Sequence, residues 1–265
     1  MATSTFTAIA DPPEIQKANP IHGDAGVKFG YEGAIVAGIS TYGWAAQAII
    51  AELGNGWLSN GWSETFYRAG VYVDDELTSS VEPSGVDVWA IDQTNDSGTS
   101  TVTGTCGLGQ APWFDDFDLP SRRSPEPAVV RPRPLDPTKV PSYEDYPPME
   151  VDLTREHAID WATVRLADPD PRYVNGDTPL VHPSWVPGQM TPLIRHSYRF
   201  GIGVHAVGRV QHLAPIKAGQ KVVVAGRWTD SWQKKGRQWS TTDAVFTSED
   251  GTDLAYCRQT VVFLA

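Results

Sequence analysis

A proline-rich stretch in the middle of the chain constrains its fold more than any other feature. Residues 110–148 contain ten prolines, at positions 112, 120, 125, 127, 132, 134, 137, 141, 147 and 148. Proline lacks a backbone N–H group and has a fixed φ angle, so this density cannot propagate a helix or a central strand. The stretch is therefore expected to be a linker between residues 1–109 and residues 149–265, each the size of a small domain.

The linker also contains five aromatic residues, which is unusual for a flexible connection. Large aromatic side chains gain free energy when they leave water. We therefore expect the linker to lie against the protein surface. The five residues are Trp113, Phe114, Phe117, Tyr143 and Tyr146.

The two flanking regions show a similar order of elements. Each begins with a Pro-containing turn, at residues 19–22 and 170–173. Each later has a strand, a tight turn and a second strand, at residues 66–77 and 211–222. The nearly constant offset between these pairs indicates a duplication. Consecutive β-hairpin patterns then follow in both halves, which favours an α+β fold class.

Each half also has one apolar segment that predicts a long helix. Residues 39–53 form the first, with Gly38 before it and Gly54 at a plausible C-terminal cap. Residues 189–198 form the second, which requires Pro192 to lie in the first turn.

The charge of the chain argues against a nucleic-acid partner. The chain has 21 Lys and Arg against 32 Asp and Glu, a net charge of −11. Its basic runs, at residues 122–123 and 234–237, are short, whereas phosphate backbones require clustered cations. An acidic surface still permits an anionic ligand, because local basic groups and helix N-termini can bind one.

The chain is expected to be cytoplasmic and to have no membrane span. Its N-terminus lacks the basic and apolar regions of a signal peptide, and no apolar run approaches the ~20 residues that span a bilayer. Cys106 and Cys257 lie far apart in predicted strands, so we expect two buried, reduced thiols.

Two neighbouring sequence segments carry a family resemblance. They read Asn-Pro-Ile-His-Gly-Asp at residues 19–24 and Phe-Gly-Tyr-Glu-Gly-Ala-Ile-Val-Ala-Gly at residues 29–38. Together they resemble the hydratase signature of the MaoC-like family, whose members are (R)-specific enoyl-CoA hydratases and dehydratases. The second half is similar to the other module of this family through residues 162–173 and 181–183.

The resemblance implies a double hotdog fold. Each module would have a long central helix wrapped by an antiparallel β-sheet, with the Pro-rich linker at residues 110–148 between them. Residues 1–109 would form the module with the hydratase-like motif, and residues 149–265 the other. Because hotdog modules generally pair, we also expect a homodimer.

The resemblance also implies roles for individual residues. His22 would transfer the proton, because the pKa of imidazole is about 6.5 and the ring can therefore both accept and donate a proton near neutral pH. Asn19 would orient the reacting group. Gly38 and Ile39 would lie at the helix N-terminus, where free N–H groups polarise the thioester carbonyl. Asp24 and Tyr31, within the matching segments, are expected to contact the substrate.

The sequence departs from the family pattern at Lys17. The family signature is Asp-x-Asn-Pro-x-His, and Lys17 occupies the position of the Asp. A charged lysine has no acceptor, so it cannot take a proton from water. In the second half, the same signature keeps the acid as Asp168 but has Asp170 and Tyr173 in place of Asn and His. We expect that half to be structural, with Asp168 capping a turn.

These observations favour a lyase that adds or removes water on a CoA- or carrier-linked small molecule, with Lys17, Asn19 and His22 as its catalytic candidates. Two alternatives stay open. One is a hotdog enzyme with diverged chemistry, an isomerisation, elimination or cyclisation in which Lys17 stabilises an enolate or a carboxylate. The other is a non-catalytic partner subunit. No cofactor is implied, and the remaining histidines show no metal-ligand spacing.

Overall fold

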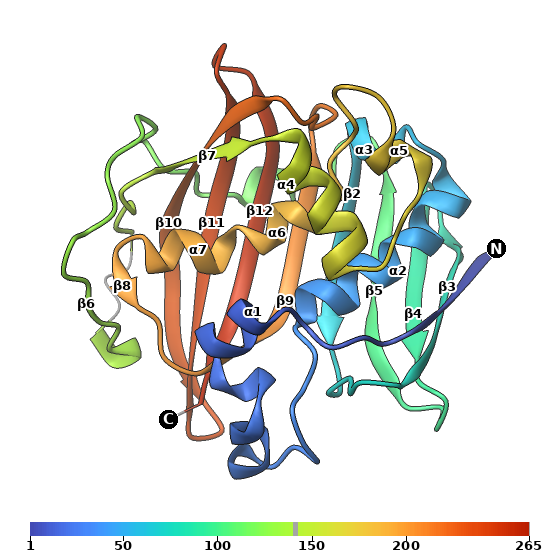
Figure 1. Ribbon diagram of the computed structural model, residues 1–265, viewed down its shortest axis with the longest axis horizontal. Helices are drawn as coiled ribbons and strands as arrows, with labels where there is room; N and C mark the ends of the chain where they lie inside the picture. The colour runs from blue at the N-terminus through green and yellow to red at the C-terminus, as the bar shows by residue number, and fades with distance from the viewer. Residues whose placement is uncertain (140–142, 265) are drawn as a thin grey trace.

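The computed structural model describes residues 1–139 and 143–264. Its strands form a ten-stranded antiparallel sheet in the order β1-β3-β4-β5-β2-β9-β12-β11-β10-β7 (Figure 1). The strands of the first half are β1 (Ala2–Thr7), β2 (Gly61–Tyr67), β3 (Glu76–Gly85), β4 (Val88–Thr94) and β5 (Ser100–Leu108). Those of the second half are β7 (Met149–Leu153), β9 (Gly203–His212), β10 (Gln220–Lys234), β11 (Arg237–Ser248) and β12 (Asp253–Phe263).

The strand order is the same in both halves when it is followed from each outer edge to the middle of the sheet. Strand β1 corresponds to β7, β3 to β10, β4 to β11, β5 to β12 and β2 to β9. The two halves meet where β2 pairs with β9 between Trp62↔Gln211 and Phe66↔Val207. The topology therefore repeats, as expected from the sequence. The domain boundaries at residues 109 and 149 stay a prediction.

The helix of the first half matches the sequence closely. Helix α2 (Gly38–Leu53) is followed by Gly54, whose φ of 75° is readily adopted only by glycine. Its buried face, which includes Ala46 and Ile49, packs on Val81 and Ile91 of the sheet. Figure 1 shows α2 lying across the first half of the sheet, on the same side as the helices of the second half.

The expected long helix at residues 189–198 is wrong. The chain forms two short helices instead, α6 (Trp185–Gly188) and α7 (Met190–Arg195), which meet at Gln189. In a continuous helix from Trp185, Pro192 would lack the N–H group for the carbonyl oxygen of Gly188, and its ring would clash with that carbonyl, whereas Pro187 is tolerated in the first turn of α6. Large side chains of these helices, including the fully buried Trp185, fill the space over the second half of the sheet.

The remaining elements are short. They are α1 (Pro13–Ala18), η1 (Pro20–His22), η2 (Asp24–Phe29), α3 (Trp57–Asn60), η3 (Phe114–Asp116), β6 (Arg133–Pro134), η4 (Pro137–Lys139), α4 (Arg155–Asp160), the π-helical turn η5 (Trp161–Arg165), α5 (Pro171–Val174) and β8 (Tyr198–Arg199). Within residues 1–139 and 143–264, no helix is long and apolar enough to cross a membrane. Cys106 and Cys257 are free and buried, as predicted.

Four of the five linker aromatics pack as expected. Ser63 of β2 bonds to Tyr42 of α2, so the neighbouring Trp62 points to the opposite face of the sheet. There Trp113 packs edge-on against Trp62, with ring centroids 5.9 Å apart. Phe114 and Phe117 contact Tyr256, and Tyr146 is buried. Tyr143 differs, because 68% of it is exposed.

Ion pairs also hold the linker to this face. Arg258 of β12 pairs with Asp243 of β11 at 2.6 Å, and Asp243 accepts the N–H of Asp118 at 2.7 Å. Arg227 of β10 pairs with two linker carboxylates, Asp145 at 2.6 Å and Asp118 at 2.8 Å. The linker is therefore attached by charge-assisted hydrogen bonds as well as by its aromatic rings.

We predict that Arg258→Leu destabilises the protein by about 3 kcal/mol, because it leaves the fully buried carboxylate of Asp243 without a counter-ion. Burial already raises the pKa of Asp243. The double variant Arg258→Leu/Asp243→Leu is expected to lose less stability than the single variant. Urea unfolding at neutral pH measures both, and equal losses would contradict the assignment.

Candidate active site

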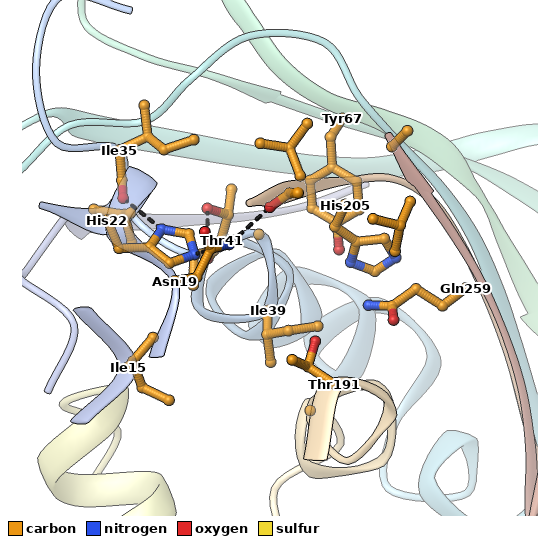
Figure 2. Close-up of a pocket in the computed structure, with 18 of the residues that line it drawn as sticks. Ile15, Asn19, His22, Ile35, Ile39, Thr41, Tyr67, Thr191, His205 and Gln259 are labelled. Carbon is orange, nitrogen blue, oxygen red and sulfur yellow. Dashed lines mark hydrogen bonds between the residues drawn. The ribbon is translucent and has the colours of Figure 1, made fainter. Parts of the chain in front are cut away.

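A cavity of about 550 Å³ lies where the two halves of the sheet meet. Its walls come from both halves: the segment around η1, the start of α2 and the end of β2 on one side, and η5, α7, β9 and β12 on the other. Figure 2 shows His22 and Asn19 at one side of this cavity and His205 and Gln259 at the other. A site at this position is thus built by segments far apart in the sequence.

His22 has a hydrogen-bonding arrangement that defines its tautomer. Its Nδ1 lies 2.8 Å from the carbonyl oxygen of Ile35, which can only accept, so Nδ1 carries the proton. The Nε2 atom then carries the lone pair and accepts a long hydrogen bond, 3.4 Å, from Nδ2 of Asn19. Burial lowers the pKa of His22. His22 is consequently a neutral imidazole whose Nε2 can act as a base.

Asn19 connects the His22 segment to the second half of the chain. It is only 8% exposed, and its Nδ2 donates to the carbonyl oxygen of Gly203 in β9 at 2.7 Å. This bond fixes the amide orientation. The Oδ1 atom is buried and has no partner within the described residues, so it can accept a hydrogen bond from a bound water or hydroxyl group.

The first turn of α2 supplies free donors. Asp11 accepts the N–H of Ala37 at 2.5 Å and the hydroxyl of Ser40 at 2.8 Å, which caps the helix from outside. The N–H groups of Gly38 and Ile39 have no acceptor in the part of the chain that the structure describes. Both residues line the cavity. These donors and the helix dipole can stabilise negative charge on a ligand oxygen.

Gly38 is required at this point by sterics. A Cβ atom at residue 38 would lie 2.9 Å from Cε1 of Tyr67 and 3.4 Å from Cβ of His205. The ring of Tyr67 therefore crosses directly over the start of α2. A side chain at residue 38 would displace this ring from the cavity wall.

The predicted site residues separate into two groups. Five of them line the cavity, namely His22, Asn19, Gly38, Ile39 and Tyr31. Lys17 and Asp24 are exposed and lie outside the lining. The role assigned to Lys17 therefore has no support from its position.

His205 and Gln259 were not predicted from the sequence. The ring of His205 packs against that of Tyr67 at a tilt of 34°, with centroids 4.5 Å apart, and its Nε2 lies 3.0 Å from the carbonyl oxygen of Val207. Burial lowers the pKa of His205 to about 4. Its Nδ1 and Oε1 of Gln259 are buried without partners among the described residues. Both residues line the cavity and can accept hydrogen bonds from a ligand.

The corresponding loop in the second half does not form a comparable site. Asp168 accepts the N–H of Asp170 at 3.1 Å and lies 3.5 Å from Nε2 of His182. The ring of Tyr173 packs on His182, with ring centroids 4.8 Å apart. These three side chains are buried, and His182 borders a cavity of only about 10 Å³, enough for one water. Asp168 thus caps a turn, as expected.

The described residues contain no group of three or more His, Cys, Asp or Glu arranged to hold a metal ion.

Neither a scan against protein-family models nor a search of curated proteins finds a match. Solved structures do match over nearly the whole chain. A putative MaoC domain protein dehydratase from Chloroflexus aurantiacus J-10-fl has a TM-score of 0.65 at 12% identity, covering 99% of this chain and 93% of its own.

Two further solved structures are similar. A conserved hypothetical protein from Mycobacterium tuberculosis with a double hotdog fold has a TM-score of 0.59 at 12% identity, covering 99% of this chain and 96% of its own. A putative thioesterase from Novosphingobium aromaticivorans DSM 12444 has a TM-score of 0.55 at 13% identity, covering 100% and 96%. The chain therefore has the α+β double hotdog fold, as predicted from the motif at residues 19–38.

Proposed function

We propose that this protein is a hydro-lyase that adds water to, or removes it from, an α,β-unsaturated acyl thioester. One observation carries the proposal: the lone pair of His22 Nε2, which accepts only a 3.4 Å hydrogen bond from Asn19, and the unpaired N–H groups of Gly38 and Ile39 belong to the same cavity. Hydration of an enoyl thioester needs a base for water and donors for an enolate oxygen. The site supplies both.

In the hydration direction, water replaces the Asn19 amide at Nε2 of His22 and donates its second hydrogen to Oδ1 of Asn19. Nε2 of His22 accepts a proton from this water while the water oxygen bonds to the β-carbon of the substrate. The electron pair of the double bond moves toward the carbonyl, and the N–H groups at the start of α2 stabilise the enolate oxygen. The imidazolium then returns its proton to the α-carbon, which gives the neutral 3-hydroxyacyl thioester.

A single base performs both proton transfers in this scheme. The described residues that line the cavity include no Asp or Glu, and Asp11 is engaged by Ala37 and Ser40. Because one imidazole takes and returns the proton, the hydroxyl group and the α-hydrogen are added to the same face of the double bond. Dehydration follows the same path in reverse.

A second candidate is hydrolysis of the thioester itself. The absence of an acidic residue from the described lining favours it, because His22 and a carbonyl held at α2 are sufficient to direct water at the carbonyl carbon. The similarity to a putative thioesterase from Novosphingobium aromaticivorans gives it further support. The thiol would then leave, with the proton from His22. Release of free thiol distinguishes this reaction from hydration.

Purified protein incubated with crotonyl-CoA and longer 2-enoyl-CoA substrates is expected to consume the enoyl chromophore without releasing thiol. His22→Ala should reduce kcat/KM by about 10²–10⁴, the usual contribution of general acid–base catalysis. Asn19→Ala should reduce it less, because the water loses an orienting partner but keeps its base. Thiol release at the rate of substrate loss would instead support hydrolysis.

Gly38→Ala is expected to lower kcat by roughly 10-fold to 10²-fold, because the new methyl group displaces Tyr67 and shifts the carbonyl from the helix N-terminus. Gly33→Ala is a matched control, since a Cβ atom there meets nothing within 4 Å. Equal kcat values for the two variants would show that no reacting group lies at Gly38.

The pH dependence should follow the pKa of His22. Burial lowers this pKa below its ordinary value of 6.5, so the reactive neutral form persists at pH 6.5. We expect kcat/KM to fall at acid pH with a half-maximal point below 6.5, because protonation removes the lone pair. A half-maximal point above pH 6.5 would contradict the assignment.

A further inference from the structure

The charge of the cavity lining is opposite to that of the whole chain. The chain has a net charge of −11, yet none of the described lining residues is acidic. Four arginines line the cavity: Arg68, Arg165, Arg195 and Arg237. Arg68 and Arg237 are exposed, whereas Arg165 is buried and Arg195 is partly buried. The two inner arginines are the unusual feature.

Arg165 lies at the first turn of α2. It is 8% exposed, and its Nε lies 3.5 Å from the hydroxyl oxygen of Ser40. Its guanidinium group stacks on Trp161 at 4.3 Å from the ring centroid. Arg165 has no direct ion pair in residues 1–139 and 143–264, and its hydrogen bond to Ser40 places it close to Gly38. Burial lowers the pKa of Arg165, and the charges of Asp11, which accepts the same Ser40 hydroxyl, and of Glu14 oppose part of that effect.

Arg195 lies at the other side of the reaction centre. Its Nη2 donates to the carbonyl oxygen of Ala18, the residue before Asn19. It too forms no ion pair with any residue that the structure describes. Burial lowers its pKa, with no carboxylate opposing that effect. Arg165 and Arg195 both lower the pKa of His22 by charge repulsion, in agreement with their positions.

Buried arginines are nearly always paired, because an uncompensated charge away from water is costly. Neither guanidinium group has a direct carboxylate partner among the described residues, so we expect an anionic group of the ligand to complete their pairing. We infer that the acyl group of the substrate carries a free carboxylate close to its double bond, which binds between Arg165 and Arg195. The substrate class is then the monothioester of an unsaturated dicarboxylic acid.

The positions of the two arginines favour a carboxylate over the phosphates of a carrier. Arg165 bonds to the turn of α2 that would hold the thioester carbonyl, and Arg195 bonds next to Asn19. An anion between them must belong to the reacting part of the substrate, since a long pantetheine arm separates carrier phosphates from the sulfur. A guanidinium group also matches a carboxylate in a two-point hydrogen bond.

This inference rests on the proposed function for the position of the thioester. Binding of two N-acetylcysteamine thioesters tests it, because neither contains phosphate: the crotonyl thioester is neutral and the fumaryl thioester has one free carboxylate. Calorimetry with the wild type and with His22→Ala, which does not consume the ligand, should give at least about tenfold tighter binding of the fumaryl compound.

Arg195→Gln and Arg165→Gln should each remove most of this preference, and Arg195→Lys should retain part of it. Arg199→Gln is the matched control, since Arg199 is exposed and does not line the cavity. If Arg165→Gln fails to fold, the Arg195 pair of variants still decides the question.

Equal binding of the two thioesters would overturn the inference. A second result would also overturn it: tighter binding of crotonyl-CoA than of the crotonyl N-acetylcysteamine thioester, with that difference lost in the Arg165 and Arg195 variants. The two arginines would then bind the phosphates of CoA and not a carboxylate of the acyl group. Failure of the proposed hydration would be seen separately: the fumaryl thioester would still bind more tightly than the crotonyl thioester, but the protein would not consume the enoyl group of either compound.

Discussion

The antiparallel pairing of β2 with β9 is the interaction on which the rest of the structure depends. It joins the two halves into one sheet between Trp62↔Gln211 and Phe66↔Val207. Tyr67, which ends β2, and His205 of β9 pack against each other beside this seam. The Asn19 side chain also reaches across it to the carbonyl oxygen of Gly203. The cavity exists because the halves meet in this register, so neither half contains the site alone.

The electrostatics of the cavity follow from how α2 begins. The Asp11 carboxylate binds Ala37 and Ser40 from outside and leaves the N–H groups of Gly38 and Ile39 for a ligand. Fixed donors in a site shielded from water stabilise developing negative charge without reorganising, and such stabilisation often contributes more to catalysis than any other effect. The neutral His22 adds a base beside them. Together they explain the proposed chemistry without a carboxylate in the described lining of the cavity.

Much of the fold was predictable from local patterns. The glycines at residues 38 and 54 marked the ends of α2, and the motif at residues 19–38 indicated the double hotdog fold. The spacing within α1 explains why only part of the motif reaches the cavity. Ile15 and Asn19 are four residues apart and share one helix face, whereas Lys17 lies midway and points away.

The rest of the site could not be predicted because it depends on tertiary contacts. Arg165, Arg195 and His205 come from the second half, and no local pattern distinguishes them from other arginines and histidines. The long helix expected at residues 189–198 failed for a related reason. Its apolar pattern was real, but Pro192 is incompatible with one helix running through both segments, so the chain forms the short helices α6 and α7, whose large side chains fill the core.

The protonation state of His22 is the central claim, and nitrogen-15 NMR of the imidazole rings tests it most directly. The His22 resonances can be assigned as those missing from His22→Ala. We predict a neutral ring at pH 7 with its proton on Nδ1 and a pKa below 6.5. A proton on Nε2, or an imidazolium at pH 7, would contradict this claim, because no lone pair would then face the cavity.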